Sequence, residues 1–120
     1  MIAPTPKPPY YAVIFTSLKS FDADNEYNEM SDRMVELAKQ QEGYLGHESA
    51  RNETGITVSY WNSLTAIKDW KQNTEHLLAQ QYGIERWYDE YKVRICLVER
   101  DYEFHHTDKN ELFKQMIKPD

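Results

Sequence analysis

Residues 55–80, GITVSYWNSLTAIKDWKQNTEHLLAQ, decide the fold of this protein. The first seven residues place Ile56, Val58 and Tyr60 in alternation with their neighbours, which is the period of a β-strand. Asn62 or Ser63 can then cap a helix. The apolar residues that follow lie on one helical stripe, which Thr74 completes: Leu64, Ile67, Trp70, Leu77 and Leu78. The stretch therefore predicts a strand followed at once by a helix that packs on a sheet.

The segments before this stretch predict a hairpin and a second helix. Residues 44–52 form a strand that pairs with residues 55–61, across a turn in which Gly55 is expected to supply a positive φ. Residues 26–41 form an amphipathic helix that Gly43 ends. The expected inward stripe of this helix is Tyr27, Met30, Met34 and Leu37.

Two further strands complete the domain. Residues 10–18 and residues 91–102 are rich in β-branched and aromatic residues. The resulting order, β-α-β-β-α-β, is typical of an α+β, ferredoxin-like fold with one antiparallel sheet and both helices on one face. The other face keeps half of the apolar residues of the first strand and has no helix to cover it. We therefore expect a homodimer in which two sheets pack face to face and form a dimeric α/β barrel.

The chain divides into three parts. Residues 1–9 hold four of the five prolines and are expected to form an extended arm. Residues 10–102 form the folded domain, and residues 103–120 form a tail with one or two helical turns over 111–117.

Composition excludes several classes of function. The chain has 120 residues, 40% of them hydrophobic and 28% charged, and a net charge of −6 without a basic cluster, which argues against nucleic acid as a partner. It contains neither an apolar run of membrane-spanning length nor a secretory signal, so we expect a cytoplasmic protein that does not enter the membrane. The single cysteine, Cys96, excludes an internal disulfide, and a buried hydrophobic role suits it better than a reactive thiol.

Several quoted pieces give the chain a family resemblance. They are the turn GYLG at 43–46, the strand ESAR at 48–51, the strand end Tyr60-Trp61, the helix around Trp70 and the closing run RWYDEYKVRICLVERDY. Together they resemble the antibiotic biosynthesis monooxygenase (ABM) family of the dimeric α/β-barrel superfamily. The resemblance implies a homodimer with a pocket between helices and sheet, where relatives oxidise polycyclic aromatic molecules with dioxygen, often without metal or flavin.

A second branch of that superfamily binds and degrades haem, which makes haem the alternative cofactor. The resemblance implies an Asn on the first strand, a Trp early in the second helix and a His later in that helix. Trp70 matches the Trp, but the first strand has no Asn, and His76 falls about one turn before the expected place near Gln80. Haem is therefore disfavoured, and we expect neither a cofactor nor a bound metal.

The candidate site residues each have a structural alternative. His76 is the candidate general base, since an imidazole titrates near neutral pH, but it also fits the edge of the core stripe. Trp70 is a candidate catalytic residue that could equally be core. The predicted substrate pocket consists of Phe15, Tyr60, Trp70 and Leu77.

Six polar side chains are assigned structural roles or left without a function. His47 and Arg51 share one strand face, Glu48 lies on the other, and an ion pair with Arg94 is expected across the strands. His105 and His106 lack nearby residues that would complete a metal site.

The sequence thus predicts a cofactor-independent monooxygenase of the ABM type that acts on a small, flat, aromatic molecule. No glycine-rich nucleotide loop or nucleophile elbow points to another chemistry. The alternatives are a non-catalytic dimer that binds a small ligand and a haem-binding relative.

Overall fold

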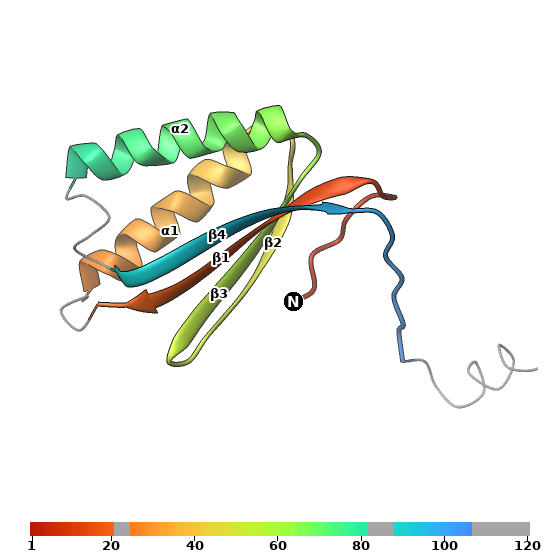
Figure 1. Cartoon of the computed structure of the whole chain (residues 1–120), viewed down its shortest axis with the longest axis horizontal. Coiled ribbons are helices and arrows are strands. Elements are labelled where there is room, and N and C mark those ends of the chain that lie inside the picture. Colours follow the sequence, from red (N-terminus) through yellow and green to blue (C-terminus); the bar gives the residue numbers. More distant parts are fainter. Residues whose placement is uncertain (21–24, 82–87, 107–120) are drawn as a thin grey trace, which may run out of the picture.

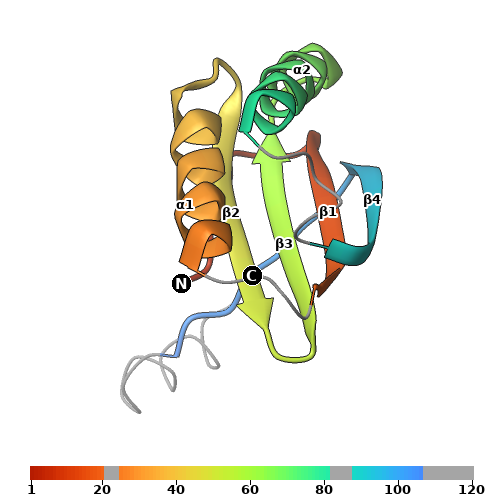
Figure 2. The ribbon, with the colours of Figure 1, turned by 90° about the vertical axis from the view of Figure 1, so that its left-hand side faces the viewer.

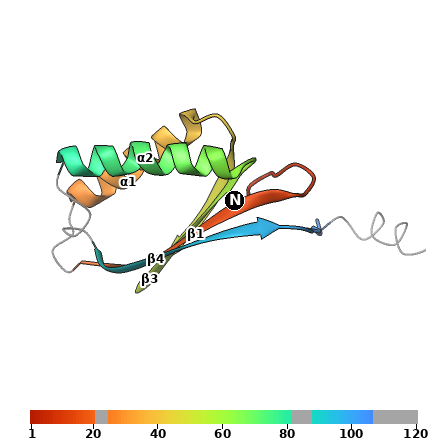
Figure 3. The same ribbon diagram turned by 45° about the horizontal axis from the view of Figure 1, so that its top comes forward.

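The computed structural model describes residues 1–20, 25–81 and 88–106, while the side chains of residues 25–28, 30 and 76–81 lie outside that description. Six elements follow in the predicted order: β1 (Tyr10–Lys19), α1 (Asn25–Gln40), β2 (Tyr44–Arg51), β3 (Thr54–Trp61), α2 (Leu64–Gln81) and β4 (Tyr88–Val98). The strands form one antiparallel sheet in the order β2-β3-β1-β4, with both helices on one face (Figure 1; Figure 3). This arrangement confirms the predicted α+β, ferredoxin-like fold.

The connection from β3 to α2 is built as the sequence predicts. The Ser63 hydroxyl accepts a hydrogen bond from the backbone N–H of Ala66 at 3.1 Å, so Ser63 is the cap of α2. After α1, Gly43 adopts a φ of 92° and its carbonyl accepts the N–H of Asn62 at 2.8 Å. A Cβ at Gly43 would lie 2.7 Å from that of Ala66, so this glycine allows the end of α1 to approach the start of α2.

Gly55 has a different role from the predicted one. The two glycines with positive φ in the described chain are Gly43 and Gly46, whereas Gly55 lies inside β3 and is buried. A Cβ at this position would collide with the guanidinium of Arg51, which lies against the bare backbone. Gly55 therefore provides space above the strand and does not shape the turn.

Other predicted boundaries and stripes also shift. β4 begins three residues earlier than expected and ends at Val98, so Tyr102 lies outside the sheet and is fully exposed. Leu64 is 53% exposed at the start of α2, and Leu37 lines a shallow groove on the outer side of α1. The residues of α1 that face the sheet are Ser31, Met34, Val35 and Ala38. Tyr27, Met30 and the expected turns at 111–117 lie outside the described residues.

The hydrophobic core occupies the end of the domain where α1 ends and α2 begins. It consists of Val13, Ala38, Trp61, Ala66 and Ile67. Trp61 is completely buried, and its Nε1 donates to the Ser59 hydroxyl at 2.8 Å. Because Trp61 combines full burial with a satisfied polar atom, it fixes the distance between α2 and the sheet at this end.

The sheet face away from the helices carries a closed polar network. The Tyr60 hydroxyl donates to Glu48 at 2.7 Å, and the same carboxylate accepts the backbone N–H of Ala3 at 2.9 Å, so the N-terminal arm lies against this face. The ring of Tyr10 meets that of Tyr60 edge-on at 5.9 Å, and its hydroxyl donates to Asp101.

Within the described part of the chain, no helix has the length and apolar character needed to span a membrane.

Candidate functional site

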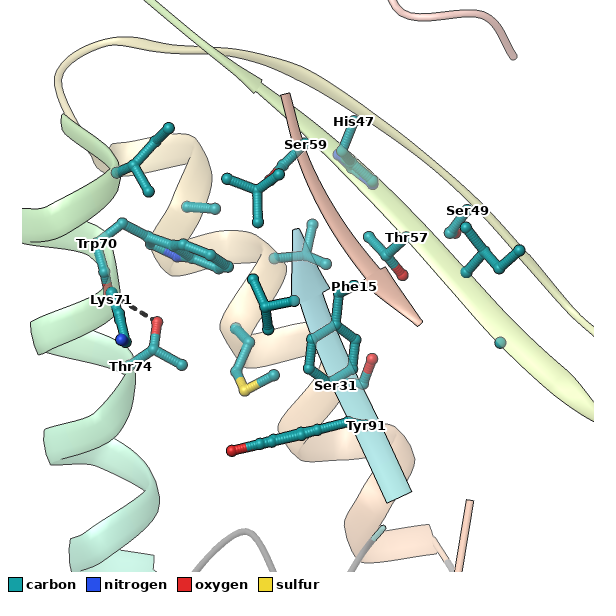
Figure 4. Close-up of a pocket in the computed structure, with 18 of the residues that line it drawn as sticks. Phe15, Ser31, His47, Ser49, Thr57, Ser59, Trp70, Lys71, Thr74 and Tyr91 are labelled. Atoms are coloured by element: carbon teal, nitrogen blue, oxygen red, sulfur yellow. Dashed lines mark hydrogen bonds between the residues drawn. The ribbon is translucent and has the colours of Figure 1, made fainter. Parts of the chain in front are cut away.

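A cavity of about 670 Å³ lies between the two helices and the sheet (Figure 4). This volume falls in the range of ordinary small-molecule sites. Its walls come from all six elements, and α1 lies over the β2 edge while β4 forms the opposite edge (Figure 2). The cavity shares Val13, Ala38 and Ile67 with the hydrophobic core, so the two adjoin.

One half of the sheet floor is apolar and aromatic. In the register of β1 with β4, Val13 faces Ile95 and Phe15 faces Val93. The ring of Phe15 also meets Tyr91 edge-on at 5.5 Å. Val93 and Ile95 remain about half exposed although they point to the helix side of the sheet. The helices thus leave an apolar surface on which a flat ligand can lie.

The other half of the floor, formed by β3 and β2, is polar. His47 faces Ser59 in the register of these strands, and Ser49 faces Thr57. All four side chains line the cavity, and Figure 4 shows His47, Ser49 and Thr57 gathered on the side opposite Trp70. The floor therefore changes from apolar to hydrogen-bonding between β1 and β3.

His47 is held in place by Tyr44. The hydroxyl of Tyr44 lies 2.5 Å from Nδ1 of His47. Burial raises the pKa of Tyr44, which keeps its phenol protonated and able to donate. The phenol oxygen can also accept: with Nδ1–H of His47 donating to Tyr44, Nε2 keeps its lone pair, and the pair offers a positioned imidazole that can take up a proton at the cavity wall.

Arg51 reaches inward from the edge strand. Its Nη2 donates to the hydroxyl of Ser17 at 2.6 Å, and Ser17 is only 2% exposed. Arg51 pairs with Gly55 across the sheet, and Gly55 pairs in turn with Ser17 on β1. The side chain thus crosses β3 above a glycine and brings a permanent positive charge toward the middle of the floor.

Trp70 lies at the junction of core and cavity. Its ring lies 5.2 Å from that of Trp61 at a tilt of 36°, and its carbonyl accepts the Thr74 hydroxyl at 2.8 Å. The indole Nε1 of Trp70 is buried and has no hydrogen-bond partner among the described residues. Such an orphaned donor is uncommon in a folded protein and costs stability.

The predicted site residues divide into three groups. Phe15 and Trp70 line the cavity. Tyr60 lies on the other side of the sheet, bonded to Glu48, because its place in β3 differs by one residue from those of Ser59 and Trp61. His76 and Leu77 belong to α2, but their side chains lie outside the described part of the structure.

Sequence reasoning assigned His47 and Arg51 to an ion-pair cluster instead of the cavity. The alternation of β2 already placed both on one face, but it could not show that this face lies under the helices. The expected pairing of Glu48 with Arg94 does not form, because β2 and β4 are opposite edges of the sheet. Glu48 binds Ala3 and Tyr60 instead.

The expectation that the protein binds neither metal nor haem stays a prediction. No group of three His, Cys, Asp or Glu residues in the described ranges could hold a metal ion, and His105 lies 3.0 Å from Glu103 in an exposed pair. β1 contains no Asn and residue 80 is Gln. The cavity walls that are described thus do not reproduce the residue set that haem degradation implies by resemblance.

A four-stranded antiparallel sheet with two helices on one face and a cavity between them defines a small α+β protein of the ferredoxin-like fold. The family model described as antibiotic biosynthesis monooxygenase matches residues 9–82, more than half of the chain. The protein belongs to this family.

Three similar proteins can be compared with this chain. The chain is 50% identical over 101 residues to YqjZ of Bacillus subtilis (strain 168), described as uncharacterised, across 82% of this chain and 88% of that protein. Its fold resembles PA3566 from Pseudomonas aeruginosa, with a TM-score of 0.61 and 18% identity over 80% of this chain and 98% of the other. It also resembles a MhuD mutant with two manganese protoporphyrin IX molecules bound per active site, with a TM-score of 0.61 and 15% identity over 78% and 99% of the two chains.

Proposed function

We propose that the protein is a cytoplasmic, homodimeric monooxygenase that binds a small, flat, aromatic molecule between its helices and sheet and oxidises it with dioxygen, without metal or flavin. The observation that carries the proposal is the cavity itself, with Phe15 and Trp70 as aromatic walls and the imidazole of His47 beside them. Family membership supports the same reaction class.

The chemistry asks little of the protein beyond a base and a dry, shaped space. A substrate with an acidic CH2 group between aromatic rings loses one proton to a histidine and forms a stabilised carbanion. The carbanion adds dioxygen, and the peroxide anion takes the proton back from the imidazolium. The hydroperoxide then loses water, which includes the second hydrogen of that carbon, and leaves a carbonyl, so one oxygen atom enters the product and the other leaves as water. The aromatic walls orient the ring system and limit access of bulk water to the anion.

Two histidines compete for the role of base. His47 lines the cavity and is oriented by Tyr44. His76 lies on α2, where the sequence first suggested a base. A general base contributes about 10²- to 10⁴-fold to turnover, so the two can be separated by substitution.

The test uses anthrone, a tricyclic compound with an acidic methylene group, and measures oxygen uptake and incorporation from ¹⁸O₂. We expect enzyme-dependent conversion to the quinone with one labelled oxygen, and a loss of about 10²-fold in kcat for either His47→Gln or His76→Ala. Unchanged turnover in both variants would exclude a histidine base.

Two other results would favour the alternatives. Tight binding of aromatic probes without any oxygen uptake favours a non-catalytic ligand-binding dimer. A shift of the Soret band on titration with haemin, at micromolar affinity, favours a haem-binding relative.

The dimer is supported by the sheet face that the helices leave bare. Leu18 and Ile56 lie on this face and are 39% and 45% exposed. Sedimentation at micromolar concentration should give a dimer, and Ile56→Lys should weaken it by placing a charge on that face. A monomeric wild-type protein would contradict this part of the proposal.

A further inference from the structure

The segment that follows the last strand indicates how two copies of the chain join, and this inference rests on the homodimer of the proposed function. We infer that residues 99–106 of each copy pair with the outer edge of β4 in the second copy, and that the partner's Tyr102 and Phe104 cover the β4 side of the cavity. Each cavity is then completed by both chains. A twisted sheet that continues from one copy into the next can curl into a barrel, so this exchange and the packing of the two bare sheet faces belong to one dimer.

The outer edge of β4 is open. β4 is the last strand in the order β2-β3-β1-β4, and no strand in the described part of the chain pairs with its second side. Its apolar residues on the helix side are between 43% and 52% exposed, and all but the last of them line the cavity: Tyr91, Val93, Ile95 and Leu97. A long apolar edge of this kind favours the addition of another strand.

Residues 99–106 do not pack on the domain as the preceding strand does. Every residue of this segment is exposed, and Tyr102 and Phe104 are 96% and 73% exposed. Figure 1 shows the segment as an extended trace that runs away from the helices and the sheet. Two aromatic rings with this exposure mark a surface that packs on another chain.

The segment is not suited to fold back onto β4 of its own chain. Neither glycine nor proline occurs between Tyr88 and His106, so the residues that favour a tight hairpin turn are missing at the junction. The start of the segment is also fixed, because Asp101 accepts a hydrogen bond from the hydroxyl of Tyr10. The strand edge and the segment that fits it therefore meet between two copies, and a two-fold axis lets each copy give one segment and receive one.

The segment has one acidic side and one aromatic side. Asp101 binds Tyr10 on the sheet face away from the helices. Side chains alternate along an extended chain, so Glu103 shares that face, whereas Tyr102 and Phe104 point to the helix side. The partner's two rings thus reach the half-exposed apolar row of β4 beside the cavity.

The charges agree with an antiparallel exchange. Residues 91–98 carry Lys92 and Arg94 and no acidic residue, whereas residues 99–104 carry three acidic residues and one basic residue. Lys92 and Arg94 alternate with the apolar row, so they lie on the face away from the helices, which is also the face of Asp101. An antiparallel pair places the basic half of each chain opposite the acidic half of the other, whereas a parallel pair would bring like charges together.

The experiment maps the contact by photocrosslinking in the full chain. Phe104 is replaced by benzoylphenylalanine, an aromatic residue that bonds to nearby C–H groups under light, and the protein is incubated with ¹⁵N-labelled wild-type protein until the subunits have exchanged. We expect cross-links from residue 104 to labelled peptides that contain residues 88–98. Cross-links to other elements of the second copy, or only within one chain, overturn the inference and leave the proposed homodimer standing. A wild-type protein that sediments as a monomer overturns both.

Two charge-reversal variants test the antiparallel pairing. Lys92→Glu/Arg94→Glu makes the β4 edge acidic, and Glu99→Lys/Glu103→Lys makes the segment basic. Each variant alone should raise the dissociation constant of the dimer about tenfold, because like charges then face each other. An equal mixture of the two should restore the wild-type dissociation constant within about twofold. A mixture that associates no better than either variant alone overturns the pairing.

Arg33→Glu/Lys68→Glu is the matched control, since it reverses two exposed charges on α1 and α2 and changes the net charge equally. Its dissociation constant should equal that of the wild-type protein. Glu99→Lys/Glu103→Lys changes only exposed residues of the segment, so it remains informative if the β4 variant does not fold. An unchanged dissociation constant in the segment variant overturns the inference.

The contribution of the partner to the cavity is measured with anthrone. Phe104→Ala removes a ring from the β4 side of the partner's cavity and should lower the affinity for anthrone about fivefold, the size of one aromatic contact. Leu64→Ala removes an exposed apolar side chain at the start of α2 and should bind anthrone as the wild-type protein does. Equal affinities of Phe104→Ala and the wild-type protein would overturn the statement that both chains complete the cavity. A wild-type protein that does not bind anthrone contradicts the proposed function, whereas the cross-links decide the inference independently.

Discussion

The two faces of the sheet carry similar polar residues, but these residues have different roles on each face. On the face away from the helices, Tyr60, Glu48 and the backbone of Ala3 bind one another, and the N-terminal arm closes the network. On the helix face, His47 and Arg51 extend from the same strand as Glu48 but border an open cavity. Adjacent residues of β2 therefore serve different purposes, because the strand turns alternate side chains to opposite faces.

The difference suggests that polar residues on one face stabilise the fold, whereas those on the other face line a space for a ligand. Polar groups on the sheet face away from the helices form hydrogen bonds with one another, so replacing one of them should lower the stability of the fold. Polar groups around the cavity also have protein partners, such as Tyr44 for His47, but they line a space that a ligand can fill, so replacing one should chiefly affect binding. Neighbouring residues on one strand can test this distinction directly.

The largest expected effect follows replacement of Glu48. Glu48→Ala removes the acceptor of two hydrogen bonds, from Tyr60 and from Ala3, and should lower the free energy of unfolding by about 2 kcal/mol. Ser49→Ala, one residue further on and exposed at the cavity, should change it by less than about 0.5 kcal/mol. Urea denaturation measures both, and equal losses would show that the two faces do not differ in this way.

The sequence predicted the fold because its signals were local and consistent. Ser63 as a cap, Gly43 as a helix end and the alternation of residues 55–61 each indicate one element, and the β-rich segments before and after them complete the order of six. The placement of Tyr60 failed for a different reason. Alternation shows that Tyr60 and Trp61 lie on opposite faces, but the choice of face depends on which side the helices cover, and that is decided by packing along the whole chain.

The cavity was harder to predict than the fold. Its polar half comes from two strands joined by a hairpin, and its apolar half from the first and last strands of the chain. Neither half shows a motif in the sequence, because the spacing that matters is across the sheet and not along the chain. The reach of Arg51 over Gly55 was hidden for the same reason, since a glycine near a turn is most often explained by its φ.

The pH dependence of stability provides a second test of the polar network on the sheet face away from the helices. Burial, the hydrogen bond to Glu48 and the charge of that carboxylate raise the pKa of Tyr60 to about 12, whereas an unfolded tyrosine titrates near 10. Above pH 10 the unfolded chain releases a proton that the folded protein still holds. The stabilisation is therefore complete below pH 10 and is lost as the pH rises toward 12.

Tyr60→Phe should accordingly cost about 1 kcal/mol at pH 8, and the difference from the wild-type protein should shrink as the pH rises to 11. Denaturation midpoints measured from pH 8 to 11 give the two curves. Burial also raises the pKa values of Tyr10 and Tyr44, so the variant keeps some pH dependence. A constant difference between the curves would mean that Tyr60 does not titrate differently in the folded and unfolded states.

The smallest effect is expected from the matching substitution on the helix face, Trp70→Phe. Tyr60→Phe removes a polar group that has a partner, whereas Trp70→Phe removes an indole N–H that is buried and has none among the described residues. Relief of the orphaned donor offsets the loss of ring volume, so the free energy of unfolding should stay within about 1 kcal/mol of the wild-type value. The affinity for anthrone, measured by calorimetry, shows whether this N–H binds a ligand. If a ligand oxygen accepts a hydrogen bond from this N–H, Trp70→Phe lowers the affinity while the stability stays the same. The free protein then bears the cost of an unpaired donor because the ligand needs that donor. If affinity is also unchanged, Trp70 contributes only its ring surface to the cavity wall.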